Sequence, residues 1–480
     1  MFASPRSFGP YLLFLFFIAN LAAAQTSPAG RRPSRPSRET HSQMTDINDR
    51  PDPAIAGALK DVSAHQIEAT IEKLVSFGTR STLSAADAQS IAAGHGIGAA
   101  REWIKSEFQR YSEACGGCLE VKTDDFVQPA GQRVKTPTQL VNVYAILHGT
   151  DPENAKRIYL VTGHYDSRNS DNFNITDPAP GANDDGSGTA VSLECARVLS
   201  KHKFPATIIF LTVAGEEQGL YGSKHFAQMA KEQGWNIEAA LNNDIVGGNK
   251  SAEQDANVVR VFSEGLPVAA KDADIKLIRS IGAESDSASR QLARYIVATG
   301  KRYGASLGTF GPTMIFRPDR YLRGGDHTSF NEEGFAAVRF TEYLEDYNRQ
   351  HQTPRTENGI EFADFAKFVD FGYVANVARL NAATLASLAT APAPPANVKL
   401  LTTQLENTSK LTWDASPGGK DATYEVLWRS TTSPDWEHKR NVGNALTATM
   451  EFSKDNVFFA VRALDAKGHA SLAVTPTPGR

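Results

Sequence analysis

Two patterns of apolar and polar positions alternate along the first half of the chain. Residues 63–77 place Ile67, Ile71 and Leu74 at helical spacing, and residues 97–111 predict a second helix. Strand-like apolar runs follow at 140–147, 157–162, 206–213 and about 240–246, with helical segments at 190–201 and 223–233. Continuous apolar strands separated by helices are typical of an α/β fold with a mainly parallel central sheet flanked by helices.

The pattern changes after a proline-rich segment at 391–396, whose composition predicts a stiff linker between two domains. Short alternating strands follow at 399–402, 409–413, 424–428 and 457–462, which predicts a small all-β sandwich over residues 397–480. The placing of Trp413, Tyr424 and the strand Phe458–Ala463 resembles a fibronectin type III domain. Contact with a cell surface or a carbohydrate, assistance in folding and a spacer role all stay open for it.

The first 52 residues have the composition of an export signal and a leader. An apolar run at 11–19 and small side chains at Ala22 and Ala24 predict a signal peptide over residues 1–24. Because the run is shorter than the ~20 residues that span a bilayer, we expect no stable membrane insertion. Residues 25–52 are rich in Pro, Ser and Arg and predict a disordered leader. We therefore expect an exported protein, either secreted or periplasmic.

Charge and cysteine content narrow the function classes. Lys and Arg total 50 and Asp and Glu total 54, so the formal net charge is −4. Nucleic-acid-binding proteins carry a basic surplus, so we expect no nucleic-acid partner. Cys115 and Cys118, separated by two glycines, predict a small disulfide in an exported chain, and Cys195 on an apolar helical stripe predicts a buried thiol.

Polar clusters fall at or just after the ends of several predicted strands. They are Gly163–Asp166, Gly181–Gly188, Gly215–Gln218, Asn242–Ile245 and Gly324–His327. Ligands of open α/β sheets bind beyond the carboxyl ends of the strands, so we expect these clusters to share one crevice. They supply histidines and carboxylates without a nearby cysteine, which is typical of a catalytic rather than a structural zinc site.

Each cluster taken singly also has a structural explanation. Asp184 and Asp185 beside glycines could form a turn that caps a helix, and Glu216 and Glu217 could be first-turn carboxylates. Asp244 is harder to explain, because an acid after an apolar strand risks burial without a partner. Their occurrence together favours a site, although the residues alone do not choose between Asp184 and Asp185.

In this order, the clusters resemble the motifs of the co-catalytic di-zinc exopeptidases of peptidase family M28. The matching motifs are His-x-Asp, Gly-x-Asn-Asp-Asp-Gly-Ser-Gly, Gly-Glu-Glu-x-Gly-Leu-x-Gly-Ser, Asn-x-Asp and Asp-His-x-x-Phe. The resemblance covers about residues 60–390 and implies a peptidase domain at 53–390, two Zn²⁺ ions per chain and peptide substrates.

The resemblance also implies a role for each matched residue. The zinc ligands would be His164 and Asp244 on one ion, Glu217 and His327 on the other, and Asp184 as a bridge between them. Glu216 would be the general base toward the water that the two ions activate. Asp166 would accept the other ring N–H of His164 and so fix its tautomer.

The function that follows is a zinc-dependent exopeptidase. We expect an aminopeptidase that hydrolyses N-terminal peptide bonds, because acidic groups at the metal centre can hold a free α-amine. A carboxypeptidase or dipeptidase stays open, since Arg317, Arg320 and Arg323 could hold an α-carboxylate. Arg323 and Tyr343 are the candidate substrate-binding residues. A non-catalytic receptor or adhesion protein is the remaining alternative, although the chain keeps every implied ligand and Glu216.

Overall fold

The computed structural model describes residues 50–419 and 421–480, within a compact unit that spans residues 46–480. The predicted signal peptide and most of the predicted leader lie outside the described residues. Asp52, at the end of that leader, caps helix α1 (Pro53–Ala58) by accepting hydrogen bonds from the backbone N–H groups of Ala54 and Ile55. Among the described residues, no helix is both long and apolar enough to cross a membrane.

An eight-stranded mixed sheet forms the centre of this unit, in the order β1-β2-β4-β3-β5-β8-β6-β7. Its strands are β1 (Leu119–Gln128), β2 (Thr138–Leu147), β3 (Arg157–His164), β4 (Thr207–Val213), β5 (Asn236–Asn243), β6 (Val258–Ser263), β7 (Gly311–Ile315) and β8 (Ala337–Glu342). The middle strands β4, β3, β5 and β8 pair in parallel, as do β6 and β7. The other pairings, β1 with β2, β2 with β4 and β6 with β8, are antiparallel. The predicted α/β class is confirmed.

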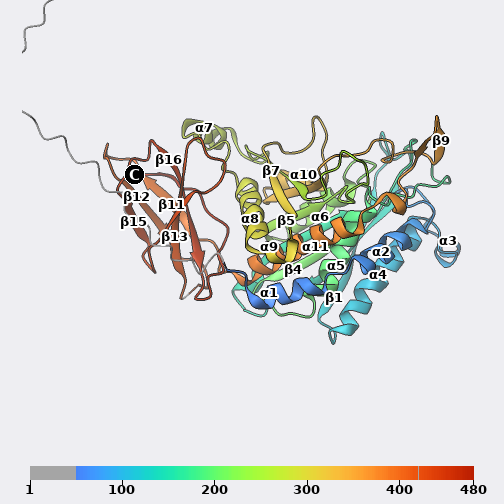
Figure 1. Ribbon diagram of the computed structural model, residues 1–480, viewed down its shortest axis with the longest axis horizontal. Coiled ribbons are helices and arrows are strands. Elements are labelled where there is room, and N and C mark those ends of the chain that lie inside the picture. Colours follow the sequence, from blue (N-terminus) through green and yellow to red (C-terminus); the bar gives the residue numbers. More distant parts are fainter. Residues whose placement is uncertain (1–49, 420) are drawn as a thin grey trace, which may run out of the picture. The chain divides into compact units, whose positions relative to one another are not determined.

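Helices cover both faces of the sheet (Figure 1). One face carries α2 (Ala64–Val75), α4 (Gly96–Ala114), α5 (Gly186–Leu199) and α11 (Phe371–Thr390), and the other carries α6 (Tyr221–Glu232) and α10 (Asp326–Glu332). Strand β4 contributes to both faces: Ile208 and Phe210 join one hydrophobic cluster, and Ile209 and Leu211 join the other. This double burial explains why its sequence is continuously apolar.

Four further helices and a hairpin belong to the described part of this larger region. They are α3 (Ala88–Ala92), α7 (Asp272–Ser280), α8 (Ala288–Arg302), α9 (Gly304–Leu307) and the hairpin of β9 (Arg355–Glu357) and β10 (Ile360–Phe362). Cys115 and Cys118 form a disulfide with an S–S distance of 1.99 Å, and Cys195 is buried and free. Both cysteine predictions are therefore confirmed.

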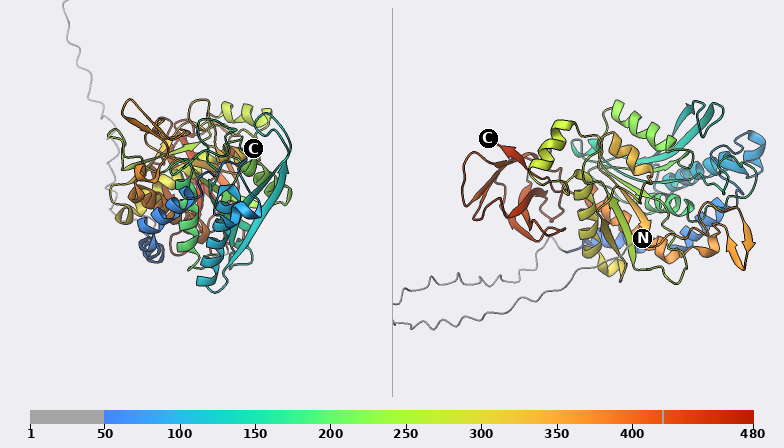
Figure 2. Two further views of the ribbon diagram at one scale, coloured as in Figure 1. Left: turned by 90° about the vertical axis from the view of Figure 1, so that its right-hand side faces the viewer. Right: turned by 90° about the horizontal axis from the view of Figure 1, so that it is seen from above.

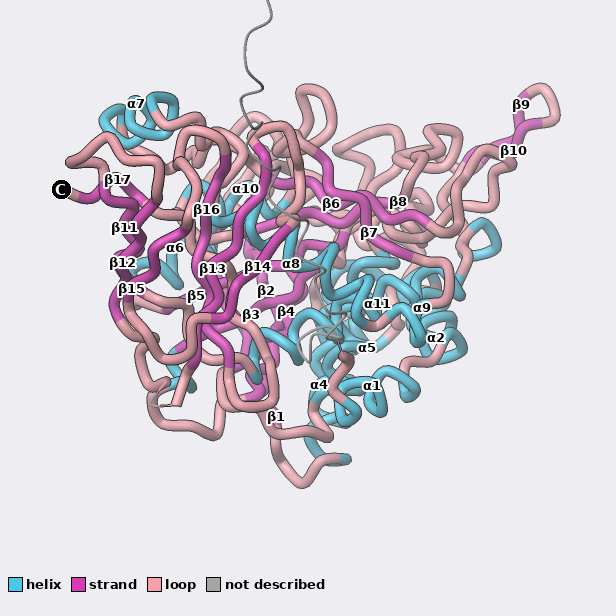
Figure 3. Tube along the Cα trace, turned by 60° about the vertical axis from the view of Figure 1, so that its left-hand side comes forward, coloured by secondary structure: helices cyan, strands magenta, loops and turns pink. Residues whose placement is uncertain are grey.

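The C-terminal strands form two small sheets, with the orders β15-β12-β11-β17 and β14-β13-β16. They are β11 (Ala396–Leu401), β12 (Ser409–Asp414), β13 (Thr423–Ser430), β14 (His438–Asn441), β15 (Thr447–Met450), β16 (Val457–Leu464) and β17 (Thr477–Gly479). One hydrophobic cluster joins Leu411 and Trp413 of the first sheet to Val426 and Val461 of the second. The predicted all-β sandwich is therefore present, and its strands group together in Figures 2 and 3.

Buried polar contacts join the sandwich to the rest of the unit. Asp286 pairs with Arg294 of α8 and with Arg429 of β13, each through an N–O distance of 2.9 Å. All of these side chains are at most 3% exposed. The indole N–H of Trp436 donates to Gln291 of α8 at 3.1 Å. The linker is also packed, because Ala391 and Ala393 are buried.

Candidate metal centre

The strand-end residues converge as the sequence predicts. His164 is the last residue of β3, Glu216 and Glu217 follow β4, and Asp244 directly follows β5. These three strands are parallel neighbours, so their carboxyl ends meet at one edge of the sheet. Asp184 joins them from the segment that leads into α5. Around them lies a cavity of about 260 Å³ whose lining includes Asp184, Glu216, Glu217 and Asp244.

Two groups of possible metal ligands lie at this cavity, and every member except the fully buried His164 lines it. The first group comprises His164, Glu216 and Asp244, and the second group comprises Asp184, Glu217 and His351. Within each group, one ligand atom from every residue lies within 4.8 Å of the others. Imidazole and carboxylate without thiolate is the ligand chemistry of a catalytic zinc site.

Asp184 faces both groups, whereas Asp185 does not. One carboxylate oxygen of Asp184 lies 3.3 Å from Nε2 of His164, and the other lies 2.9 Å from Nε2 of His351. The Asp185 carboxylate instead accepts hydrogen bonds from the backbone N–H groups of His164 and Gly188, and it caps α5. The bridging position implied for Asp184 therefore fits the geometry.

His327 lies outside both groups, which corrects the prediction that it supplies the second histidine. Its ring is fully buried on α10, where Nε2 lies 2.8 Å from the carbonyl oxygen of Pro318 and 3.7 Å from a carboxylate oxygen of Asp319. The ring therefore contacts the segment before α10 instead of the carboxylates that follow β4. His351 occupies the place that we assigned to His327.

His351 carries no local sign of its role in the sequence. It lies in a turned segment after β8 and has a left-handed backbone conformation, with φ of 55°. No strand immediately precedes it, so a search at strand ends passes over it. Its Nε2 nevertheless lies 3.0 Å from Glu217. Only the tertiary structure brings this histidine to the acidic cluster.

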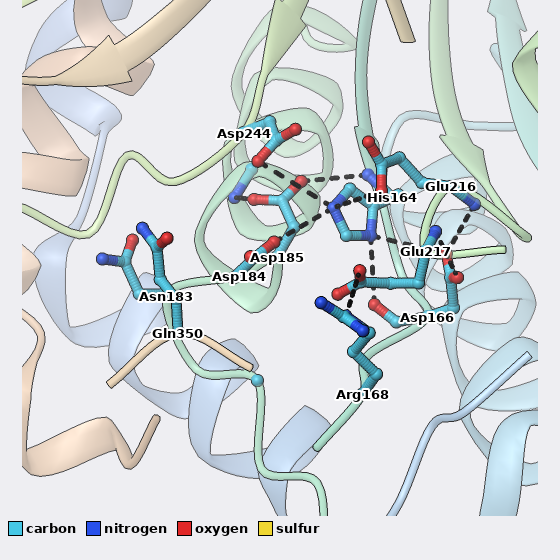
Figure 4. Close-up of polar contacts among 12 residues, drawn as sticks. His164, Asp166, Arg168, Asn183, Asp184, Asp185, Glu216, Glu217, Asp244 and Gln350 are labelled. Atoms are coloured by element: carbon cyan, nitrogen blue, oxygen red, sulfur yellow. Dashed lines mark hydrogen bonds and ion pairs between the residues drawn. The ribbon is translucent and has the colours of Figure 1, made fainter. Parts of the chain in front are cut away.

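Asp166 supports His164 and both glutamates (Figure 4). Nδ1 of His164 lies 3.1 Å from the backbone carbonyl oxygen of Asp166 and 3.4 Å from its carboxylate. The same carboxylate accepts hydrogen bonds from the Thr82 hydroxyl and from the backbone N–H groups of Glu216 and Glu217. Asp166 thereby leaves Nε2 of His164 facing the cavity, as its implied role requires.

Sequence reasoning missed two residues that hold the loop before α5. The buried carboxylate of Asp364 accepts the backbone N–H groups of Asn183 and Asp184, the latter at 2.7 Å. The buried guanidinium of Arg80 donates to the carbonyl oxygens of Tyr165 and Gly181, both at 2.8 Å. Arg80 thus links the segment after His164 to the segment before Asp184. Neither residue belongs to a motif, so no sequence signal identified them.

Burial and the crowding of carboxylates shift the pKa values of side chains in the cavity. Burial raises the pKa of Glu216, and the nearby charges of Asp244 and Glu217 raise it further. For His351, burial lowers the pKa, but the charges of Glu217 and Asp184 outweigh this and raise it to about 10. A cavity that stabilises positive charge in this way also suits metal cations.

Buried polar atoms without a hydrogen-bond partner also indicate that the cavity suits metal cations. Nε2 of His164 and Oε1 of Glu217 are buried and make no hydrogen bond within the described part of the chain. Buried polar atoms without a partner are costly. One cation in each ligand group would satisfy both atoms, so the residues present fit a zinc site.

The two candidate substrate-binding residues have different surroundings. Arg323 lines the cavity and pairs with Glu345 at 2.9 Å. Tyr343 is 47% exposed and is not among the residues that line the cavity. The structure therefore brings Arg323 to the site but not Tyr343.

Comparisons with known proteins agree with the motifs. The model of peptidase family M28 matches residues 142–369. A probable zinc metalloprotease of Pyrenophora tritici-repentis is 44% identical over 89% of this chain and 88% of its own length. One of Leptosphaeria maculans is 43% identical over 90% of this chain and 99% of its own length.

Solved structures also resemble the chain. The LapA aminopeptidase of Legionella pneumophila is 21% identical, with a TM-score of 0.48 over 70% of this chain and 75% of its own. An aminopeptidase from Aneurinibacillus sp. strain AM-1 is 16% identical, with a TM-score of 0.48 over 70% of this chain and 96% of its own.

The two ligand groups make this cavity a candidate metal centre. The family match and the sequence relatives show which class of enzyme this is: the chain belongs to peptidase family M28 and is a zinc metallopeptidase.

Proposed function

We propose that this chain is an exported aminopeptidase with two zinc ions in the cavity, which removes residues from the N-termini of peptides. The observation that carries the proposal is the pair of ligand groups, with Asp184 between His164 and His351. The ions would be held by His164 and Asp244, by Glu217 and His351, and by Asp184 between them. Carboxylate oxygens around the cavity can accept hydrogen bonds from a free α-amine.

The chemistry divides between the metal and the chain. When bound, zinc lowers the pKa of water and polarises the scissile carbonyl group. Glu216 takes the proton from the attacking water and delivers it to the leaving amine. Its side chain is suited to this role because it reaches the cavity and is 15% exposed, whereas that of Glu217 is 4% exposed and contacts His351. Asp166 holds both glutamates through their backbone N–H groups.

Export and the C-terminal sandwich belong to the same proposal. The apolar run at 11–19 followed by small residues supports a cleaved signal peptide, and the Cys115–Cys118 disulfide suits an oxidising compartment. N-terminal sequencing of the mature protein should begin at Gln25. For the sandwich we propose a fibronectin type III-like module that contacts a surface or a carbohydrate. Binding of the intact protein to a glycan array, with denatured protein as control, tests that role.

Peptides with one blocked end test the aminopeptidase proposal. We expect two zinc ions per chain by elemental analysis, cleavage of C-terminally amidated peptides and loss of cleavage after N-acetylation. The reverse pattern, in which amidation abolishes cleavage and acetylation is tolerated, would identify a carboxypeptidase. Full activity after exhaustive removal of metal would contradict zinc dependence.

A further inference from the structure

Arginines line a large part of the cavity that contains the two ligand groups. They are Arg133 between β1 and β2, Arg168 after β3, and Arg320 and Arg323 between β7 and α10. Leu220 and Ile245 also line the cavity, and its described lining includes no Phe, Tyr or Trp. The cavity therefore offers a substrate four guanidinium groups beside its carboxylates.

Arg168 depends on the ligand groups for its partners. Its Nε lies 3.1 Å from a carboxylate oxygen of Glu217 (Figure 4). Its terminal nitrogen lies 2.7 Å from Nδ1 of His351. Both partners belong to the second ligand group. Two divalent cations balance the four carboxylates that line the cavity, those of Asp184, Glu216, Glu217 and Asp244. Once the two cations neutralise these carboxylates, no negative charge among them remains to neutralise the guanidinium group of Arg168.

The other three arginines add to this excess. Arg133 is exposed and donates to the backbone carbonyl oxygen of Glu217 at 3.2 Å, and no ion pair joins it to a carboxylate among the described residues. Arg320 and Arg323 share the carboxylate of Glu345 at 3.0 and 2.9 Å. Glu345 also pairs with Arg260 at 3.1 Å, and Arg320 has a second partner in Asp319. The zinc-loaded cavity would therefore be electropositive.

We infer that these arginines bind a carboxylate of the substrate, so that the preferred substrates are short peptides with a carboxylate next to the scissile bond. The inference rests on the proposed aminopeptidase function and specifies its substrate class. A guanidinium group matches a carboxylate through two parallel hydrogen bonds. The carboxylate is either the C-terminal group of a dipeptide or an acidic side chain on the residue after the scissile bond.

Matched pairs of peptides test the inference and separate the two sources. Ala-Ala is compared with Ala-Ala-amide, and Ala-Glu-amide with Ala-Gln-amide, using the zinc-loaded protein. We expect kcat/KM to be about 10-fold or more higher for the carboxylate member of at least one pair, as for a charged hydrogen bond worth about 1.5–3 kcal/mol. The first pair reports on the C-terminal carboxylate and the second on the side chain.

Variants assign the effect to the arginines. Arg133→Gln and Arg323→Gln should reduce the ratio of kcat/KM within the responding pair by about 10-fold, mainly through KM, and Arg133→Lys should restore part of it. Arg279→Gln is the matched control, because Arg279 is exposed on α7 and does not line the cavity. It should leave the ratio unchanged. An equal loss for both members of a pair would indicate a structural role and contradict the inference.

Binding provides a readout that does not depend on turnover. Zinc-loaded Glu216→Gln protein should bind the carboxylate peptide more tightly than its uncharged partner in calorimetry, and added salt should reduce the difference. Equal hydrolysis and equal binding within both pairs would overturn the inference and leave the aminopeptidase proposal intact. If no peptide with a free N-terminus is hydrolysed, the proposed function fails, and the calorimetric comparison still decides the inference.

Discussion

The two ligand groups of the cavity are built in different ways. His164, Glu216 and Asp244 all come from the carboxyl ends of neighbouring parallel strands. The second group depends on His351, which lies in a turned segment and has a side chain that is 26% exposed, whereas the His164 side chain is fully buried. One half of the site thus follows from sheet geometry and the other half requires a loop. We expect the first group to hold its metal ion more tightly than the second.

The largest effect should come from Glu216→Gln, which tests whether Glu216 is a base or a ligand of the first group. The substitution keeps the size of the side chain and removes its ability to accept a proton. We expect kcat to fall by about 10²–10⁴-fold while both zinc ions remain. Elemental analysis alongside peptide hydrolysis measures this. Loss of one zinc ion would make Glu216 a ligand and would change the composition of the first group.

Replacing each histidine compares the groups directly. His164→Ala and His351→Ala should each lower zinc content by one ion per chain and reduce kcat/KM by at least about 100-fold, since a ligand is lost. His327→Gln is the control, because it replaces a buried imidazole outside both groups. It should keep two zinc ions. A variant of His327 that folds but lacks one zinc ion would restore the original assignment.

Stepwise removal of metal should show which of the two ligand groups binds its zinc ion more tightly. Titration of the zinc-loaded protein with a chelator is expected to release zinc in two phases, the first from the more exposed second group. In His351→Ala only the later phase should remain, and in His164→Ala only the earlier one. A single phase that releases two ions from the unmodified protein would show that exposure of His351 does not weaken its group.

A smaller effect is expected from Asp364→Asn, which disturbs the backbone of Asp184 without touching a ligand atom. The buried carboxylate accepts two backbone N–H groups, and an amide oxygen is a weaker acceptor. We expect about a 10-fold to 100-fold loss of metal affinity or activity. Asp370→Asn is the matched control, because Asp370 also accepts two backbone N–H groups but caps α11. It should be nearly neutral, since Asn is a good N-cap residue.

The sequence predicted those parts of the molecule whose signals are local. Apolar runs located β2 to β5. The helical pattern at 63–77 located α2, whose N-cap Ser63 accepts a hydrogen bond from the backbone N–H of Gln66. Strand β8 was not predicted, and its sequence includes Arg339. This arginine is fully buried because it pairs with Asp244 at 2.9 Å. A charge neutralised by a distant partner cannot be recognised from hydrophobic periodicity.

The metal centre was likewise predictable only where its residues belong to local sequence motifs. Motifs at strand ends identified His164, Glu216, Glu217 and Asp244, whereas the choice of Asp184 over Asp185 came from family resemblance. In the structure that choice has a physical basis, because the Asp185 carboxylate is already occupied by backbone N–H groups. His327 was assigned as a ligand because it belongs to the Asp-His-x-x-Phe motif, whereas His351 belongs to no motif.

The shared carboxylate of Asp286 has a consequence for work on shortened forms of the enzyme. Removing the sandwich would take away Arg429 and leave Asp286 with Arg294, at a surface that is now covered. A protein that ends at Ala391 would therefore expose the charged side chains of Asp286 and Arg294, and we expect it to behave differently in solution for reasons unrelated to catalysis. The chain that keeps its sandwich is accordingly the proper reference form for kinetic studies.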